Sequence, residues 1–65
     1  MNINVNGESH SVTAATLAEA LVELGFGCAK VATAVNEGFV PVGLRSGHTL
    51  NEGDRLEILA PMQGG

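Results

Sequence analysis

The sequence predicts a small α+β domain in which one helix packs on one face of a mixed sheet of four or five strands. Three observations support this class. Residues 1–6 alternate between polar and apolar, and the turn signal Asn6-Gly7 follows them. One amphipathic helix is predicted after Thr16. A second alternating segment contains Leu56 and Ile58. A helix on one face of a sheet is the two-layer arrangement available to a 65-residue chain.

The first two strands are expected to form a hairpin. Ile3 and Val5 alternate with asparagines, which is the period of a half-buried strand. Asn6 and Gly7 both tolerate the positive φ of a type I′ turn. Residues 8–12 are therefore predicted to be the returning strand.

The helix has both a start signal and a stop signal. Thr16 and Glu19 fit a capping box, and Gly25 fits a left-handed C-terminal cap. Between them an apolar stripe recurs at helical spacing: Leu17, Ala20, Leu21 and Leu24. We expect a helix of about three turns.

Residues 31–35 are apolar and rich in β-branched side chains, which predicts a strand, and Glu37-Gly38 is expected to be the turn after it. Phe39 and Val40 extend briefly before Pro41, which excludes a central strand at that point. Residues 42–49 are predicted to be a loop, and residues 51–54 a tight turn.

The last predicted strand directs Leu59 away from the core. Leu59 is out of phase with Leu56 and Ile58, so it should lie on the outer face of the sheet. An exposed apolar residue there could belong to a docking surface, with Phe39 and Val40 as further members. The alternative is an isolated surface leucine, which is common in proteins.

The composition argues against several classes of function. The net charge of −4 would repel phosphate backbones, so no nucleic acid partner is expected. No stretch is long and apolar enough for a membrane span, and the N-terminal residues do not resemble a signal peptide, so a cytoplasmic location is expected. Cys28 is a single cysteine and favours packing, and His10 and His48 lack metal-ligand spacing, so neither a metal site nor a catalytic residue is predicted.

The chain is expected to divide into a folded domain, residues 1–60, and a flexible tail, residues 61–65. The tail reads Pro61-Met62-Gln63-Gly64-Gly65. Gly64 and Gly65 have no Cβ, so their backbone could enter a channel that a side chain would block. A frayed chain end is the alternative explanation. An accessible carboxylate on such an arm can attack the α-phosphate of ATP when an activating enzyme supplies metal and cationic groups. The tail therefore predicts that the chain is a carrier rather than an enzyme.

These residues resemble the ThiS family, the sulfur carriers of thiazole formation in thiamine biosynthesis. The resemblance rests on the tail Pro61–Gly65, on Val35-Asn36, on Phe39-Val40-Pro41 and on the segment 50–58. The hairpin and helix agree with the family in length and order. Val42, where the family often has a basic residue, and the segment 43–48 depart from the pattern.

The resemblance implies a ubiquitin-like β-grasp fold and a defined chemistry. The carboxylate of Gly65 would be adenylated with ATP by an E1-like (ThiF-like) adenylyltransferase. It would then become a thiocarboxylate with sulfur from a cysteine desulfurase or another donor, and pass the sulfur to a thiazole synthase (ThiG-like). Pro61, Met62, Gln63 and Gly64 would thread into these partners, and no bound cofactor is implied.

Three other functions are compatible with the sequence. The chain could carry sulfur for molybdopterin or another metabolite, or it could be a ubiquitin-like modifier that forms isopeptide bonds with lysines. A free-standing enzyme using Cys28 or His48 would keep its activity after deletion of Gly65.

Overall fold

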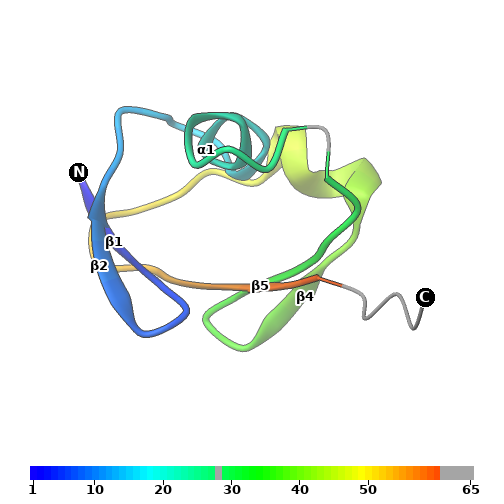
Figure 1. Ribbon diagram of the computed structural model, residues 1–65. Coiled ribbons are helices and arrows are strands. Elements are labelled where there is room, and N and C mark those ends of the chain that lie inside the picture. Colours follow the sequence, from blue (N-terminus) through cyan, green and yellow to red (C-terminus); the bar gives the residue numbers. More distant parts are fainter. Residues whose placement is uncertain (28, 61–65) are drawn as a thin grey trace.

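The computed structural model describes residues 1–27 and 29–60 of the chain. Within these residues five strands form a mixed sheet, and one α-helix crosses one face of it (Figure 1). The two-layer α+β prediction is therefore confirmed. No helix in the described part of the chain is both long enough and apolar enough to cross a membrane.

The strand that comes last in the sequence lies at the centre of the sheet. The strands are β1 (Asn2–Val5), β2 (Glu8–Ser11), β3 (Ala32–Val35), β4 (Gly38–Val40) and β5 (Arg55–Leu59), in the spatial order β2-β1-β5-β3-β4. β1 and β5 are parallel, and the other neighbours are antiparallel. β5 thus has a hydrogen-bonded neighbour on each side.

The first hairpin turn forms at the predicted residues. Asn6 has φ +51° and Gly7 has φ +88°, the left-handed region in which these two residue types are tolerated. The side chain of Asn4 also accepts a hydrogen bond from the Gly7 amide at 2.9 Å. Ile3 and Val5 are buried, as their alternation predicted.

The second hairpin turn lies one residue earlier than predicted. Val35 pairs with Gly38, so the two turn residues are Asn36 (φ +51°) and Glu37 (φ +72°), and Gly38 opens β4. The expected turn at Glu37-Gly38 is wrong because the pairing of β3 with β4 fixes the register. That register places a glutamate in a backbone region that it rarely adopts.

The helix α1 (Leu17–Glu23) begins as predicted but is shorter. The Thr16 hydroxyl accepts a hydrogen bond from the Glu19 amide at 3.3 Å, while the Glu19 carboxylate accepts one from the Ala15 amide at 3.2 Å. The reciprocal bond of the capping box thus reaches one residue further back than expected. Seven residues make about two turns rather than three.

A Schellman motif ends the helix. Gly25 has φ +95°, its amide donates to the Val22 carbonyl at 3.1 Å, and the Phe26 amide donates to the Leu21 carbonyl at 2.7 Å. Phe26 packs partly against the core. The predicted glycine cap is confirmed, and these turn bonds end the helix before a third turn.

The predicted loop at residues 42–49 contains a 3₁₀ helix, η1 (Val42–Gly47). Its Arg45 is buried: Nε donates to the Thr33 hydroxyl at 3.0 Å and Nη2 donates to the Val31 carbonyl. The Thr33 hydroxyl in turn donates to the Val40 carbonyl at 2.8 Å. The loop prediction is wrong because this segment is held by contacts with distant strands, which its local sequence does not show.

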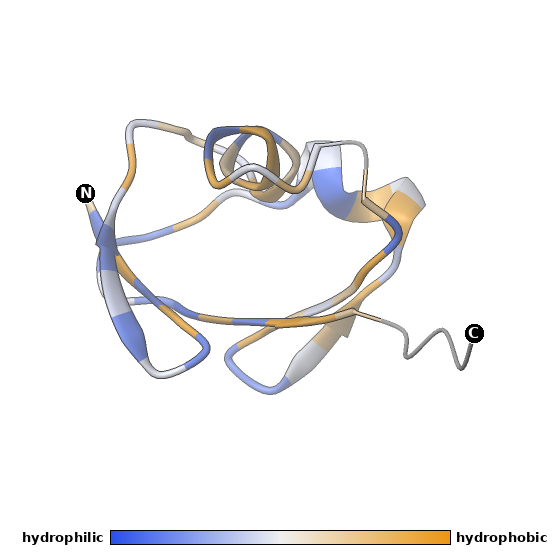
Figure 2. Cartoon of the chain, in the orientation of Figure 1, coloured by the Kyte–Doolittle hydropathy of each residue, from blue (hydrophilic) through white to orange (hydrophobic). Residues whose placement is uncertain are grey.

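The core lies between α1 and the inner face of the sheet. Figure 2 shows apolar residues along the strands and helix, and polar residues at the two hairpin turns. The buried hydrophobic residues are Ile3, Val5, Val12, Ala14, Leu17, Ala20, Leu21, Val31, Val35, Val40, Leu50, Leu56 and Ile58. The stripe predicted on the helix is therefore the face that packs on the sheet.

Candidate functional site

The candidate site is built around the end of β5, because the proposed reactive tail follows this strand in the sequence. Leu59 pairs with Ala32 of β3, so the strand keeps a backbone partner to its last residue. The tail residues Pro61, Met62, Gln63, Gly64 and Gly65 lie outside the described residues. Their predicted roles therefore stay predictions.

Asn6 completes the other edge of β5. Strand β1 ends at Val5, but the Asn6 side chain continues its ladder: Nδ2 donates to the Ile58 carbonyl at 3.1 Å, and the Ile58 amide donates to Oδ1 at 2.8 Å. The Asn6 amide itself donates to the Leu56 carbonyl at 3.0 Å. One turn residue thus satisfies three backbone groups of β5 next to the point where the tail begins.

Asn36 holds the opposite end of the same strand. Its amide donates to the Arg55 carbonyl at 2.8 Å, and its Oδ1 accepts from the Arg55 amide at 3.0 Å. Its Nδ2 donates to Asp54 at 3.0 Å, and that carboxylate also accepts from the Asn51 amide at 2.9 Å. The predicted turn at 51–54, with Gly53 at φ +83°, is thereby connected to the β3–β4 hairpin.

An apolar surface covers the outer face of the sheet beside the end of β5. Leu59 is 73% exposed and Phe39 is 70% exposed. Ala32 and Ala34 of β3 separate them in the sheet. A hollow of about 400 Å³ is lined by these four residues together with Asn6, Thr33 and the β5 residues Glu57 and Ile58. We call Ala32, Ala34, Phe39 and Leu59 the outer apolar patch.

Leu59 and Phe39 of the predicted docking surface are exposed, whereas Val40 is not, and the docking role itself stays a prediction. Val40 is 5% exposed and belongs to the core. Successive residues of a strand point to opposite faces, so Phe39 and Val40 cannot both lie on the outer face. Ala32 and Ala34 take its place, and they could have been found by applying the same alternation to β3.

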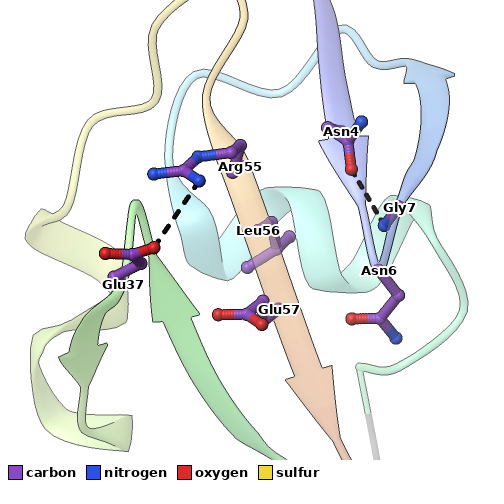
Figure 3. Close-up of a pocket in the computed structure, with 7 residues that line it drawn as sticks. All are labelled: Asn4, Asn6, Gly7, Glu37, Arg55, Leu56 and Glu57. Atoms are coloured by element: carbon purple, nitrogen blue, oxygen red, sulfur yellow. Dashed lines mark hydrogen bonds and ion pairs between the residues drawn. The ribbon is translucent and has the colours of Figure 1, made fainter.

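A second, polar hollow of about 300 Å³ adjoins this surface between the two hairpin turns (Figure 3). It is lined by Asn4, Asn6, Gly7, Glu37, Arg55, Leu56 and Glu57. Arg55 and Glu37, which both line it, form an ion pair at 3.7 Å, and both side chains are exposed. The outer face is therefore apolar toward the end of β5 and polar toward its beginning.

The two histidines form no metal-binding group in the described part of the chain. His10 lies 3.8 Å from Glu8 on the edge strand β2, and His48 follows η1. Among residues 1–27 and 29–60, no group of three or more metal-ligating side chains is close enough to hold an ion. Cys28 lies outside the described residues.

Comparison with known proteins decides the family. The model of the ThiS family matches residues 3–65, nearly the whole chain. The chain belongs to the ThiS family. The match includes the Gly64-Gly65 end on which the resemblance partly rests.

Solved structures agree with this family assignment. The chain is 30% identical to a thiamine biosynthesis protein (ThiS) from Geobacter metallireducens, with a TM-score of 0.83 and complete coverage of both chains in its crystal structure. The NMR structure of a thiamine biosynthesis protein from the same organism gives a TM-score of 0.79 at 29% identity, and covers all of this chain and 88% of that one. The β-grasp fold implied by the resemblance is confirmed.

One curated relative has a different size. The chain is 39% identical over 66 aligned positions to a thiazole synthase from Paramagnetospirillum magneticum. The alignment covers all of this chain but 20% of the relative, so the chain spans about a fifth of that protein's length. A ThiS-like segment therefore occurs within a thiazole synthase chain.

Proposed function

We propose that this ThiS-family chain is a sulfur carrier for thiazole formation in thiamine biosynthesis, and that the carboxylate of Gly65 is the group that carries the sulfur. The observation that supports this most is the family match across residues 3–65, together with the shared fold of a thiamine biosynthesis protein. The chain acts in this role as a co-substrate of other enzymes.

The proposed chemistry has two steps. A Gly65 carboxylate oxygen attacks the α-phosphorus of ATP in an E1-like adenylyltransferase, and pyrophosphate leaves. In the second step, hydrosulfide from a sulfur donor attacks the acyl carbon, AMP leaves with the bonding electrons, and loss of the S–H proton gives the thiocarboxylate. If the donor is instead the persulfide of a cysteine desulfurase, the same displacement of AMP gives an acyl disulfide, and a second thiol must cleave its S–S bond, leaving the thiocarboxylate and a disulfide. Metal and cationic groups of the activating enzyme would stabilise the charge that develops on the phosphates.

The folded domain would position the arm for these partners. β5 is bonded to β1 and β3, and the Asn6 side chain secures Ile58, so the tail follows a strand with fixed geometry. A rigid base lowers the conformational entropy lost when a short arm is placed in an active site. The outer apolar patch, beside the same strand end, is proposed to dock on the activating enzyme before sulfur is loaded and on the sulfur acceptor afterwards.

Thiazole synthase is the proposed acceptor of the sulfur. The relative from Paramagnetospirillum magneticum has a ThiS-like segment within a thiazole synthase chain. Joining a carrier to its acceptor raises their effective concentration, which favours transfer between them. Such an arrangement supports a functional pairing of the two proteins.

Intact mass measurement tests the proposal. The purified chain is incubated with an E1-like adenylyltransferase, ATP and a sulfide source. We expect one oxygen to be replaced by sulfur, and fragmentation to place the change at Gly65. A control chain extended by one residue beyond Gly65 should remain unmodified at Gly65, because its carboxylate is then part of a peptide bond. Wild-type chain without sulfur, or sulfur at another residue, would contradict the proposal.

A further inference from the structure

Glu57 occupies the boundary between the two parts of the outer face. It lies on β5 between Arg55 and Leu59, pairs across the sheet with Ala34, and lines both the apolar and the polar hollow. Figure 3 shows its carboxylate on the outer face beside β5, with Glu37 on the adjacent turn. A charged group is thus placed directly beside the outer apolar patch.

The Glu57 carboxylate has no cationic partner within the described residues. Close contacts of basic with acidic side chains there join Glu8 with His10 and Glu37 with Arg55, and no lysine, arginine or histidine nitrogen lies within 4.0 Å of Glu57. Its side chain also accepts no hydrogen bond in residues 1–27 and 29–60. Water satisfies such a carboxylate on the free protein, but a partner that covers it must supply a donor or leave a costly unpaired charge.

The cations of the chain do not compensate Glu57. Arg45 is buried and bonded to Thr33 of β3, and Arg55 is paired with Glu37. The third, Lys30, precedes β3 and forms no ion pair with Glu57 within 4.0 Å in the described residues. The outer face therefore has two carboxylates, Glu37 and Glu57, and one guanidinium, Arg55. A partner with a cation facing this surface would be attracted, and one with a carboxylate there would be repelled.

We propose that Glu57 is a specificity-determining residue for the docking of a thiazole synthase. In this complex the synthase places an apolar side chain on the outer apolar patch and a lysine or arginine side chain against Glu57. This inference rests on the proposed function. The relative whose thiazole synthase chain contains a ThiS-like segment is the reason for choosing this partner. The small side chain of Ala34 leaves room beside Glu57 for the incoming cation.

Electrostatic and apolar contributions should be separable at this surface. Contact with Leu59 and Phe39 would supply most of the area removed from water, while the Glu57 pair would govern partner choice and the rate of association. Association that depends on this charge should slow as salt concentration rises.

Binding measurements with charge variants test the inference. The probe is the purified thiazole synthase encoded in the same genome, and the variants are Glu57→Gln, Glu57→Lys and the control Glu8→Lys. Glu8 is exposed but lies on β2 opposite the core residue Val5, away from the outer face. At low salt we expect dissociation constants about fivefold higher for Glu57→Gln and roughly thirtyfold higher for Glu57→Lys, with Glu8→Lys within about twofold of wild type. Thermal unfolding of each variant shows whether it is folded.

The outcomes separate this inference from the proposed function. Glu57 variants that fold and bind like Glu8→Lys overturn the role of Glu57, even if Gly65 becomes a thiocarboxylate. Wild-type chain that does not bind the synthase overturns the choice of partner. Charge-dependent binding without any thiocarboxylate at Gly65 supports the docking surface and refutes the carrier chemistry.

Discussion

Replacing Asn6 with glycine should loosen the end of β5 without straining the turn. Glycine adopts the φ of +51° found at this position, so the hairpin backbone can keep its shape. What is lost is the side-chain amide that bonds both the carbonyl and the amide of Ile58. The variant therefore isolates the contribution of the side chain.

The expected loss of stability follows from these contacts. Two hydrogen bonds each contribute a net of about 0.5–1.5 kcal/mol, and the greater freedom of glycine in the unfolded chain adds roughly 0.4–1 kcal/mol. A total of about 2 kcal/mol would lower the melting temperature by roughly 8–16 °C in a domain of this size. Because the lost bonds are local, the Ile58 amide should become more exposed to solvent than the Leu56 amide.

Urea unfolding and amide hydrogen exchange measure these two effects. We expect a lower free energy of unfolding and faster exchange at Ile58 than at Leu56. The control is Asn36→Gly, which removes the equivalent side-chain bonds at the other end of β5 and should leave the ratio of the two exchange rates unchanged. If Asn6→Gly had wild-type stability and wild-type protection at Ile58, the anchoring role of Asn6 would be refuted.

Three further substitutions test other parts of the structure. Glu37→Gly should raise the free energy of unfolding by about 0.5 kcal/mol in a urea titration. The reason is that relief of the backbone strain at Glu37, which has a positive φ, outweighs the loss of its exposed ion pair with Arg55. A loss of stability would contradict this. Arg45→Met should lower the free energy of unfolding by about 2–3 kcal/mol because the hydrogen bonds to Thr33 and to the Val31 carbonyl disappear. Unchanged thermal unfolding would be inconsistent with that view. Leu59→Glu should slow adenylation about tenfold in a pyrophosphate-exchange assay while the domain stays folded. Leu44→Glu, on the exposed side of η1, is its control, and equal rates for the two variants would argue against docking through the patch.

The parts of the fold that local residues determine were predictable from the sequence. Asn6-Gly7, the Thr16 cap and Gly25 each act through backbone preferences of a few neighbouring residues, and all three are confirmed. The alternation of β5 likewise placed Leu59 on the outer face. These features depend on short-range physics, so a single sequence contains enough information to identify them.

The errors arise where distant parts of the chain decide the outcome. The register between β3 and β4 moved the turn to Asn36-Glu37, and contacts with β3 ordered the segment around Arg45. The bonds from Asn6 to Ile58 join residues far apart in the sequence, and nothing in the local pattern distinguishes them from an ordinary turn. Val40 was assigned to the surface because its neighbour Phe39 was, although strand geometry separates the two.

The central position of β5 has a consequence for how the molecule acquires its structure. Synthesis delivers this strand after all the others, yet both hairpins need it as their shared partner. Until residues 55–59 are available, β1 and β3 each present an open strand edge. Closing the sheet then requires a contact between strands about fifty residues apart in the sequence, and such long-range contacts slow folding. The nascent domain should therefore assemble late and in one cooperative step, and a fragment that stops short of β5 should be prone to aggregation.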